Sequence, residues 1–227
     1  AGPLTLIKIR RNMKRIRIVL IALVGAVALI AFKNEPGTPN AQPIETGEIS
    51  STMNPVLEEQ EKGFHKTLTL QNITFDIKST GEGSIQQLSI QPKGLEIDNQ
   101  DISREIDGSV VDAEIEDLNS DGSPEIVIYT VSAGSGSYGN VIGYSVNNGK
   151  SMSEIYFPDL FDNKEASTGY MGHDEFTIME TTLARRFPIY KEGDTNSNPT
   201  GGTRQIEYKL QDGEASRLFV IHKISEY

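Results

Sequence analysis

Residues 111–131 read Val111-Asp-Ala-Glu-Ile-Glu-Asp-Leu-Asn-Ser-Asp-Gly-Ser-Pro-Glu-Ile-Val-Ile-Tyr-Thr-Val131. At the start, Val111, Ala113 and Ile115 alternate with acidic residues, the period-two pattern of a strand with one buried and one charged face. The final Ile126–Val131 is a continuous run rich in β-branched side chains, as expected of a central strand. Asp121-Gly122 lies between the two patterns and is typical of a turn. The segment therefore predicts two successive strands joined by a loop.

Strand-like spacing of apolar residues extends from Leu68 to Ile221, and no long helix-period pattern interrupts it. Turn-forming pairs separate the apolar stretches at Asp107-Gly108, Asn148-Gly149, Gly193-Asp194, Gly201-Gly202 and Asp212-Gly213. Asn148-Gly149 stands between two strand patterns and predicts a hairpin. About eight to ten short strands at this spacing predict an all-β fold, an antiparallel sandwich or barrel, over residues 64–227.

A basic and then apolar segment precedes this domain. Met13 is followed by three basic residues and an apolar run over residues 18–32, which predicts either an export signal peptide or a membrane-anchor helix over residues 13–32. At about 1.5 Å per residue, the run is short for a hydrocarbon core of about 30 Å, which favours the signal peptide. Ala26-Val27-Ala28, a candidate cleavage motif, lies inside the apolar run, so the anchor stays open.

The other N-terminal residues are not expected to pack into the domain. We expect residues 1–12 to be an upstream extension, and residues 33–63, rich in Pro, Asn, Thr and Glu, to be a disordered linker. With either a signal or an anchor, the β domain is expected in the periplasm, secreted, or held on the periplasmic face of the inner membrane. A membrane contact is expected only through an uncleaved segment 13–32.

The charge of the chain is unevenly distributed. The chain has 32 acidic and 21 basic residues, but residues 1–32 hold six of the basic residues and no acidic one. Residues 33–227 therefore carry 15 basic against 32 acidic residues, a net charge of −17. So acidic a body argues against a nucleic-acid partner and favours a basic partner or a bound cation. The three histidines and the lack of cysteine exclude disulfides, thiol catalysis and most zinc sites.

The loop between the first two strands has the spacing of a calcium site. Asp117, Asn119 and Asp121 occupy positions 1, 3 and 5, a glycine occupies position 6, and Glu125 occupies position 9. The strand flanks differ from the helices of an EF-hand and are closer to the calcium loops of FG-GAP-type proteins. The alternative is a plain turn in which the Asx side chains cap backbone amides. Calcium is therefore the one cofactor that the sequence suggests.

A glycine-rich segment, Ser132–Gly139, follows the predicted central strand. Its glycines at 134, 136 and 139 match G-x-G-x-x-G, but a dinucleotide site needs a strand followed by a helix, and here a second strand follows. The serines at 135 and 137 lack the glycine pattern of a nucleophile elbow, and no spacing points to a base histidine. We therefore expect no enzyme activity.

Two readings of the segment remain, a flexible hairpin and a protruding recognition loop. Glycines allow close approach of the backbone to a partner, and Tyr138 offers a rigid ring with a polar tip.

Ser135-Gly136-Ser137-Tyr138 matches the S-G-x-Y loop of bacterial periplasmic lysozyme inhibitors. In order along the chain, the other matching segments are Val111–Tyr129, Gly172–Phe176, Arg185–Tyr190 and Pro199–Arg204. Together they resemble the family of periplasmic inhibitors of invertebrate-type lysozyme (PliI) over roughly residues 66–224. The resemblance implies an antiparallel β-structure, usually dimeric, whose loop enters the lysozyme cleft.

In that family the first serine and the tyrosine of the loop are the key inhibitory residues. Carried over, these are Ser135 and Tyr138, with Gly136 meeting the backbone requirement between them and Ser137 at the free position. Gly134, Gly139 and Arg204 are expected to support the loop; Arg204 closes the turn-rich stretch 190–204, where a structural role is expected.

The sequence thus predicts an inhibitor whose partner is a lysozyme, of the invertebrate type. Lysozymes cleave with two carboxylates, and a hydroxyl-bearing loop can hydrogen-bond these carboxylates without offering a bond to cleave. The acidic body would steer a cationic enzyme toward the loop. The alternative is a calcium-stabilised extracytoplasmic binding or adhesion module with another target.

Overall fold

A computed structural model describes residues 63–227 of the chain. The predicted upstream extension, the predicted signal or anchor, and the predicted linker except for its last residue lie outside the described residues. Between Gly63 and Tyr227, no helix is long and apolar enough to cross a membrane.

The described residues form twelve strands in three antiparallel sheets of four strands each. The first sheet has the order β1-β2-β3-β4, the second β5-β6-β7-β8, and the third β12-β11-β10-β9. The strands are β1 Gly63–Leu70, β2 Ile73–Thr80, β3 Ile85–Lys93, β4 Ile102–Asp107, β5 Ser109–Glu116, β6 Glu125–Val131, β7 Gly139–Asn147, β8 Ser151–Ile155, β9 Glu175–Met179, β10 Thr182–Pro188, β11 Thr203–Gln211 and β12 Leu218–Glu226. The predicted all-β antiparallel class is confirmed.

The number of strands exceeds the predicted eight to ten. One unforeseen strand is β4, whose sequence Ile-Ser-Arg-Glu-Ile-Asp contains only two apolar residues. It lies at the edge of the first sheet, where polar and charged side chains meet water, so its hydrophobic pattern is weak. The two helical turns, η1 (Leu160–Asp162) and α1 (Lys164–Ser167), lie between β8 and β9.

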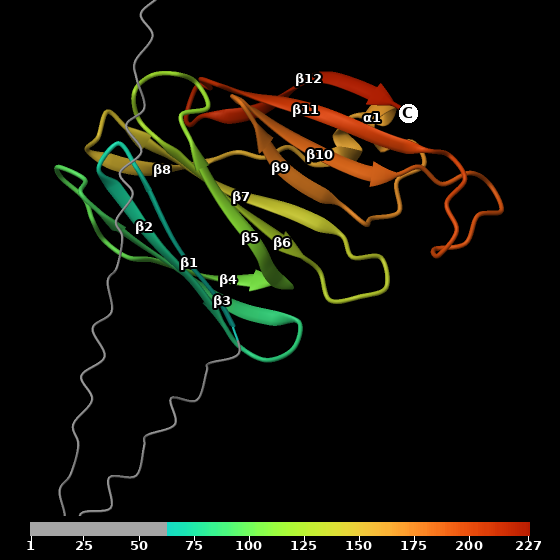
Figure 1. The fold of residues 1–227 in the computed structure, drawn as a ribbon, viewed down its shortest axis with the longest axis horizontal. Helices are drawn as coiled ribbons and strands as arrows, with labels where there is room; N and C mark the ends of the chain where they lie inside the picture. The colour runs from blue at the N-terminus through green and yellow to red at the C-terminus, as the bar shows by residue number, and fades with distance from the viewer. Residues whose placement is uncertain (1–62) are drawn as a thin grey trace, which may run out of the picture. The chain divides into compact units, whose positions relative to one another are not determined.

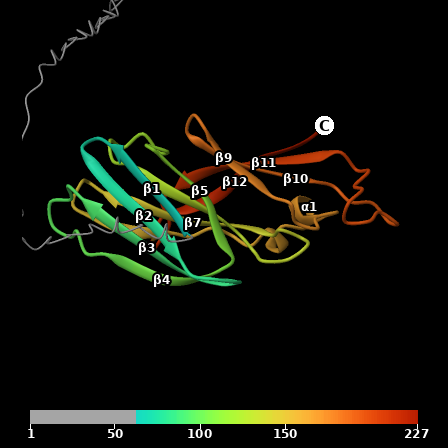
Figure 2. The same ribbon diagram turned by 60° about the horizontal axis from the view of Figure 1, so that its bottom comes forward.

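The second sheet is the middle layer of a three-layer stack, as Figures 1 and 2 show. Ile126 and Ile128 join a core shared with the first sheet, whereas Val127 and Tyr129 join a core shared with the third. Side chains alternate between the faces of a strand, so a strand covered on both faces is apolar at most of its positions. This explains the continuous run at Ile126–Val131 and confirms it as a central strand.

One predicted core residue is wrong. The alternation in the sequence predicts Val111 on the buried face of its strand, yet Val111 is 55% exposed. The register between β5 and β6 shifts between Val110 and Asp112, so Val111 is the extra residue of a β-bulge. Val110 takes the inward position before the bulge, and Ala113 takes it afterwards.

The predicted hairpin at Asn148-Gly149 joins β7 to β8, and both residues adopt the positive φ angles that such a turn requires. At the opposite end of β7, the longer connection from β6, residues 132–138, leaves the middle sheet and lies toward the right in Figure 1.

Candidate functional site

The loop over residues 132–138 has a defined shape. At its base, the Ser132 backbone N–H donates to the Tyr138 carbonyl at 2.9 Å, and the Tyr138 N–H donates to the Ser132 hydroxyl at 3.1 Å. At its tip, the Ser137 N–H donates to the Gly134 carbonyl at 3.1 Å, which closes a turn around Ser135 and Gly136. These bonds favour the recognition loop over the flexible hairpin.

Gly136 is needed because the Tyr138 ring packs over it. A Cβ atom at this position would lie 2.4 Å from the Cε2 atom of Tyr138. At Gly139 a Cβ would lie 2.6 Å from the Cβ of Asp174, whereas at Gly134 it would meet nothing within 4 Å. The predicted supporting role therefore has a steric basis at Gly139 and none at Gly134.

Two neighbouring segments hold the carbonyl groups of the loop. The His173 backbone N–H donates to the carbonyl of Gly136 at 2.8 Å and to that of Ser137 at 3.2 Å. The Asn196 side-chain amide donates to the Ser135 carbonyl at 2.6 Å. The His173 ring bonds the Asn196 side-chain oxygen at 3.1 Å, which connects the two supports. The His173 ring therefore serves the loop as a support.

Below the loop lies a buried ion pair. The Asp174 and Arg185 side chains are 0% and 4% exposed, and their carboxylate oxygen and Nε atom are 2.6 Å apart. The other Asp174 oxygen accepts from the Gly139 N–H at 2.7 Å and from the Tyr170 hydroxyl at 2.6 Å. Since Gly139 begins β7, this carboxylate ties the end of the loop to the third sheet.

The same network shifts two pKa values. Burial, and then the hydrogen bond to Asp174, raises the pKa of the Tyr170 hydroxyl, which therefore stays protonated as a donor. Burial alone would lower the pKa of Arg185, but the Asp174 carboxylate outweighs it and raises that pKa. Both groups thus keep fixed protonation states around physiological pH.

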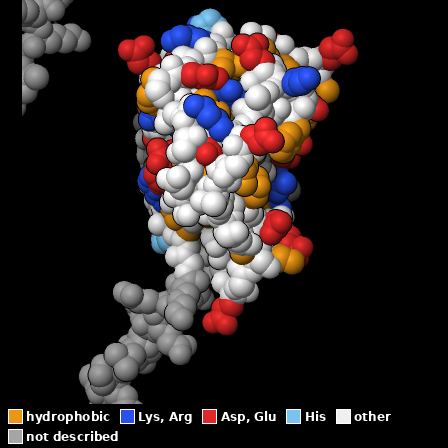
Figure 3. All heavy atoms as spheres, turned by 90° about the vertical axis from the view of Figure 1, so that its right-hand side faces the viewer, with side chains coloured by type: hydrophobic (Ala, Val, Ile, Leu, Met, Phe, Trp, Pro, Cys, Tyr) orange, Lys and Arg blue, Asp and Glu red, His pale blue; other side chains and the backbone are white. Residues whose placement is uncertain are grey.

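The side chains of the loop point to solvent while its backbone is held. Ser135 is exposed, and Tyr138 is 47% exposed, with its ring edge-on to Tyr170 at a centroid distance of 5.7 Å. The contacts that hold these two residues reach mainly backbone atoms, so the Ser135 hydroxyl and the outer part of the Tyr138 ring face outward. Figure 3 shows this end of the domain, where acidic and basic side chains are both scattered over the face with hydrophobic side chains among them.

Residues 73–157 match the family described as the periplasmic lysozyme inhibitor of I-type lysozyme, PliI. The resemblance to PliI is confirmed. No curated protein and no solved structure matches the chain.

The PliI match extends from β2 to just beyond β8 and includes the whole loop 132–138. It indicates lysozyme inhibition, a lysozyme as the partner, a periplasmic location and a role other than catalysis. His173, Arg185 and Asn196 lie beyond the matched residues. In the sequence, His173 and Arg185 lie in segments that resemble PliI and Asn196 lies in the turn-rich stretch 190–204, but no local pattern assigns any of the three a role in supporting the loop.

The suggested calcium loop also lies within the PliI match. Asp117 accepts hydrogen bonds from the N–H groups of Asp121 and Gly122, each at 3.0 Å, and Asp121 pairs with Arg217 at 2.6 Å. Within residues 63–227, no group of three or more His, Asp or Glu side chains is arranged to hold a metal ion. This arrangement favours the capped turn, and calcium stays a prediction that thermal unfolding with added Ca²⁺ or chelator would test.

Glu125, the ninth residue of that loop, points inward. Its side chain is fully buried, accepting from the Leu118 N–H at 2.8 Å and from the Ser145 hydroxyl at 2.5 Å. The nearest Arg217 nitrogen is 3.9 Å away. Burial raises the pKa of Glu125 to about 7, against the opposing effect of these donors. The folded protein therefore takes up a proton here as the pH falls below neutrality.

Between about pH 5 and pH 8, the free energy of unfolding is expected to fall as pH rises. The sign follows because the folded-state pKa of Glu125 is raised, so protonation favours the folded state. Glu125→Gln should remove this fall and exceed the wild-type stability at pH 8 by about 2–3 kcal/mol. Urea unfolding across this range measures it, with the exposed Glu165→Gln as the control. Equal slopes for wild type and Glu125→Gln would contradict the assignment.

The contacts of the Arg204 side chain are made outside the loop 132–138. Arg204 is 5% exposed, donates to the carbonyls of Ala166 and Thr168, and pairs with Glu226 at 2.6 Å. It therefore connects α1 and the last strand, in agreement with the expected structural role, and it makes no hydrogen bond to residues 134–139.

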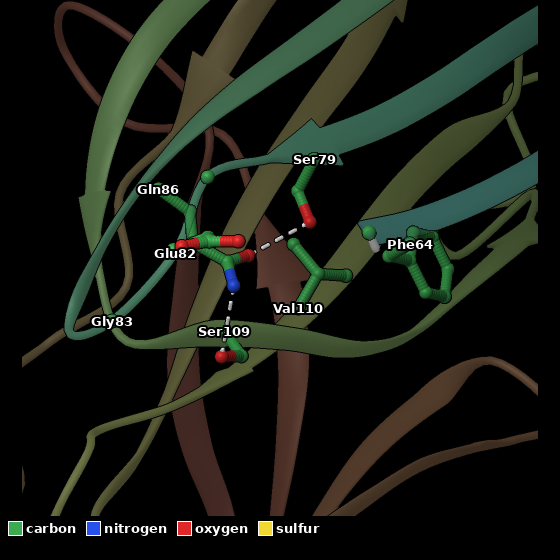
Figure 4. A pocket seen from close by; sticks show the side chains of 9 residues that line it. Phe64, Ser79, Glu82, Gly83, Gln86, Ser109 and Val110 are labelled. Atoms are coloured by element: carbon green, nitrogen blue, oxygen red, sulfur yellow. Dashed lines mark hydrogen bonds between the residues drawn. The ribbon is translucent and has the colours of Figure 1, made fainter. Parts of the chain in front are cut away.

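A hollow of about 610 Å³ lies between the first sheet and the start of β5, where Ser109 pairs with Val131 just before the loop. Its polar lining is joined by hydrogen bonds from Ser79 to Gln86 at 2.9 Å and from Gln86 to Ser109 at 3.1 Å, as Figure 4 shows. Glu82 is the only ionisable side chain that lines it, so it lacks a catalytic set.

Proposed function

We propose that the protein inhibits an invertebrate-type lysozyme by inserting Ser135–Tyr138 into the active-site cleft. The observation that carries the proposal is the bracing of the loop, whose three successive carbonyls, Ser135 to Ser137, accept hydrogen bonds from Asn196 and His173. A loop held through its backbone loses little conformational entropy on binding, and its side chains stay free for the partner.

The proposed chemistry of inhibition is occupation without turnover. Lysozyme cleavage requires two carboxylates on either side of a sugar bond. The Ser135 hydroxyl can donate to such a carboxylate, and the Tyr138 ring can fill the space of a sugar ring. Because the loop carries no glycosidic bond, the enzyme has nothing to cleave. The net charge of −17 over residues 33–227 would speed encounter with a cationic enzyme at low salt.

The PliI match and the geometry both count against serine catalysis. The His173 ring bonds Asn196 rather than a serine hydroxyl, so the described loop lacks the nucleophile–base contact of a serine enzyme. Nothing observed favours the calcium-stabilised module over inhibition. A homodimer and anchoring at the inner membrane stay predictions, for which light scattering and cell fractionation are the measurements.

The protein is expected to inhibit an invertebrate-type lysozyme stoichiometrically and to leave a chicken-type lysozyme active. Titration of each enzyme with the protein, read as the rate of cell-wall lysis, measures this. Inhibition of both enzymes would support the loop but contradict the type specificity. A folded protein without effect on either enzyme would contradict the proposed function.

A further inference from the structure

A shallow groove begins beside Tyr138 and continues away from the loop. Its first part, about 400 Å³, is lined by Tyr138, Tyr156, Phe161 and Tyr170 among others. A second hollow of about 430 Å³ shares Tyr156 and Phe157 with the first and extends along β8. We call the surface formed by Tyr138, Tyr156, Phe157, Phe161 and Tyr170 the aromatic groove.

Two large aromatic side chains of the aromatic groove are more than half exposed to solvent. Phe161 is 65% exposed and Tyr156 is 55% exposed. Tyr170 contacts the rings on both sides, with centroid distances of 5.9 Å to Phe161 and 5.7 Å to Tyr138. The three rings thus form a continuous row that starts in the loop. Exposed aromatic clusters of this kind are typical of protein interfaces, where a few rings contribute most of the affinity.

The backbone under the exposed rings is fixed. The Phe161 N–H donates to the side chain of Asp159 at 2.9 Å, which caps the turn η1. The Tyr156 N–H donates to the Arg217 carbonyl, and the Tyr156 carbonyl accepts from Phe219, both at 2.9 Å. Rings on an ordered backbone bind with a small entropic cost, as the loop does.

The charges beside the groove suit a cationic partner. Its two arginines are already paired: Arg185 with the buried Asp174, and Arg104 with Glu154, each at 2.6 Å. Asp159 is exposed beside Phe161. A cationic surface packed against the groove would therefore meet a carboxylate at its edge and rings at its centre.

We infer that the aromatic groove is a second contact surface for the lysozyme. In the complex, the rim of the enzyme's cleft packs against Phe161 and Tyr156 while the loop enters the cleft. This inference rests on the proposed function and on the continuity of the groove with Tyr138. The loop blocks the sugar site, and the groove prolongs the lifetime of the complex.

The test compares Phe161→Ser and Tyr156→Ser with Ile97→Ser in the full chain. Ile97 is 75% exposed and lies next to the hairpin at the far end of β7, so it controls for the loss of an exposed apolar side chain. Each groove variant is expected to bind invertebrate-type lysozyme at least 10-fold more weakly, mainly through faster dissociation in surface plasmon resonance. Ile97→Ser should bind as wild type, and thermal unfolding should show all three variants folded.

The outcomes separate the groove from the loop. Unchanged binding by both groove variants, with binding lost in Tyr138→Ala, would overturn the groove and leave the proposed function standing. Unchanged binding by the two groove variants and by Tyr138→Ala would overturn both the groove and the proposed function. Exposed rings can also stack on sugars, so binding to an N-acetylglucosamine tetramer is measured in parallel. Sugar binding that both groove variants abolish, with lysozyme affinity unchanged, would overturn the inference in favour of a glycan site.

Discussion

Tyr138→Ala is expected to weaken inhibition of an invertebrate-type lysozyme by about 2 kcal/mol or more, roughly 30-fold. The ring is 47% exposed, and the backbone of Tyr138 is held separately by two hydrogen bonds with Ser132. Removing the ring should therefore take away contact surface without releasing the loop. The inhibition constant and the unfolding midpoint are the two measurements.

The control for this variant is Tyr227→Ala, which removes a 71% exposed tyrosine whose backbone pairs with Thr203. It should change neither inhibition nor stability. If Tyr138→Ala inhibits as well as wild type, the loop is not the inhibitory element. If instead it unfolds at a lower temperature by many degrees, the loss of inhibition says nothing about contact.

Asp174→Ala should lower the free energy of unfolding by about 3–5 kcal/mol, the usual cost of leaving a buried charge without its partner. Arg185 would remain buried, and the N–H of Gly139 and the hydroxyl of Tyr170 would lose their acceptor. Since Gly139 directly follows the loop, any folded fraction should also inhibit less well. Urea unfolding measures the first effect and titration of the enzyme the second.

Glu154→Ala is the matched control, because it removes a surface ion pair with Arg104 of the same 2.6 Å length. Both partners of that pair are exposed, and such pairs contribute at most about 1 kcal/mol. A similar, small loss for Asp174→Ala and Glu154→Ala would show that the Asp174 network does not support the fold.

Local patterns in the sequence predicted those parts of the domain that depend on neighbouring residues. The Ile126–Val131 run identified a strand covered on both faces, and Asn148-Gly149 identified a hairpin. The loop Ser135–Tyr138 could be found in the same way, because its residues are adjacent in the chain. A strand with few apolar residues, such as β4, could not be found from hydrophobic alternation.

Alternation of apolar and polar residues can also predict the burial of a side chain wrongly. Val111 continues the alternation of its strand, yet the bulge at this position turns it to solvent. A bulge shifts the phase by one residue, and the inward positions before and after it, Val110 and Ala113, are both apolar, so the alternation alone does not reveal it. Glu125 holds the ninth position of the predicted calcium loop, and its side chain is buried and accepts hydrogen bonds from the Leu118 N–H and the Ser145 hydroxyl.

The sequence by itself determined the all-β class, the central strand, the adjacent residues of the candidate loop and the acidic charge, since each follows from spacing or composition. Only the tertiary structure decided what supports the loop. Asp174 and Asn196 lie 35 and 61 residues from the loop atoms that they bind, and no local pattern connects them. Such contacts form because the third sheet packs on the second, which brings side chains from distant segments within hydrogen-bond distance of the loop.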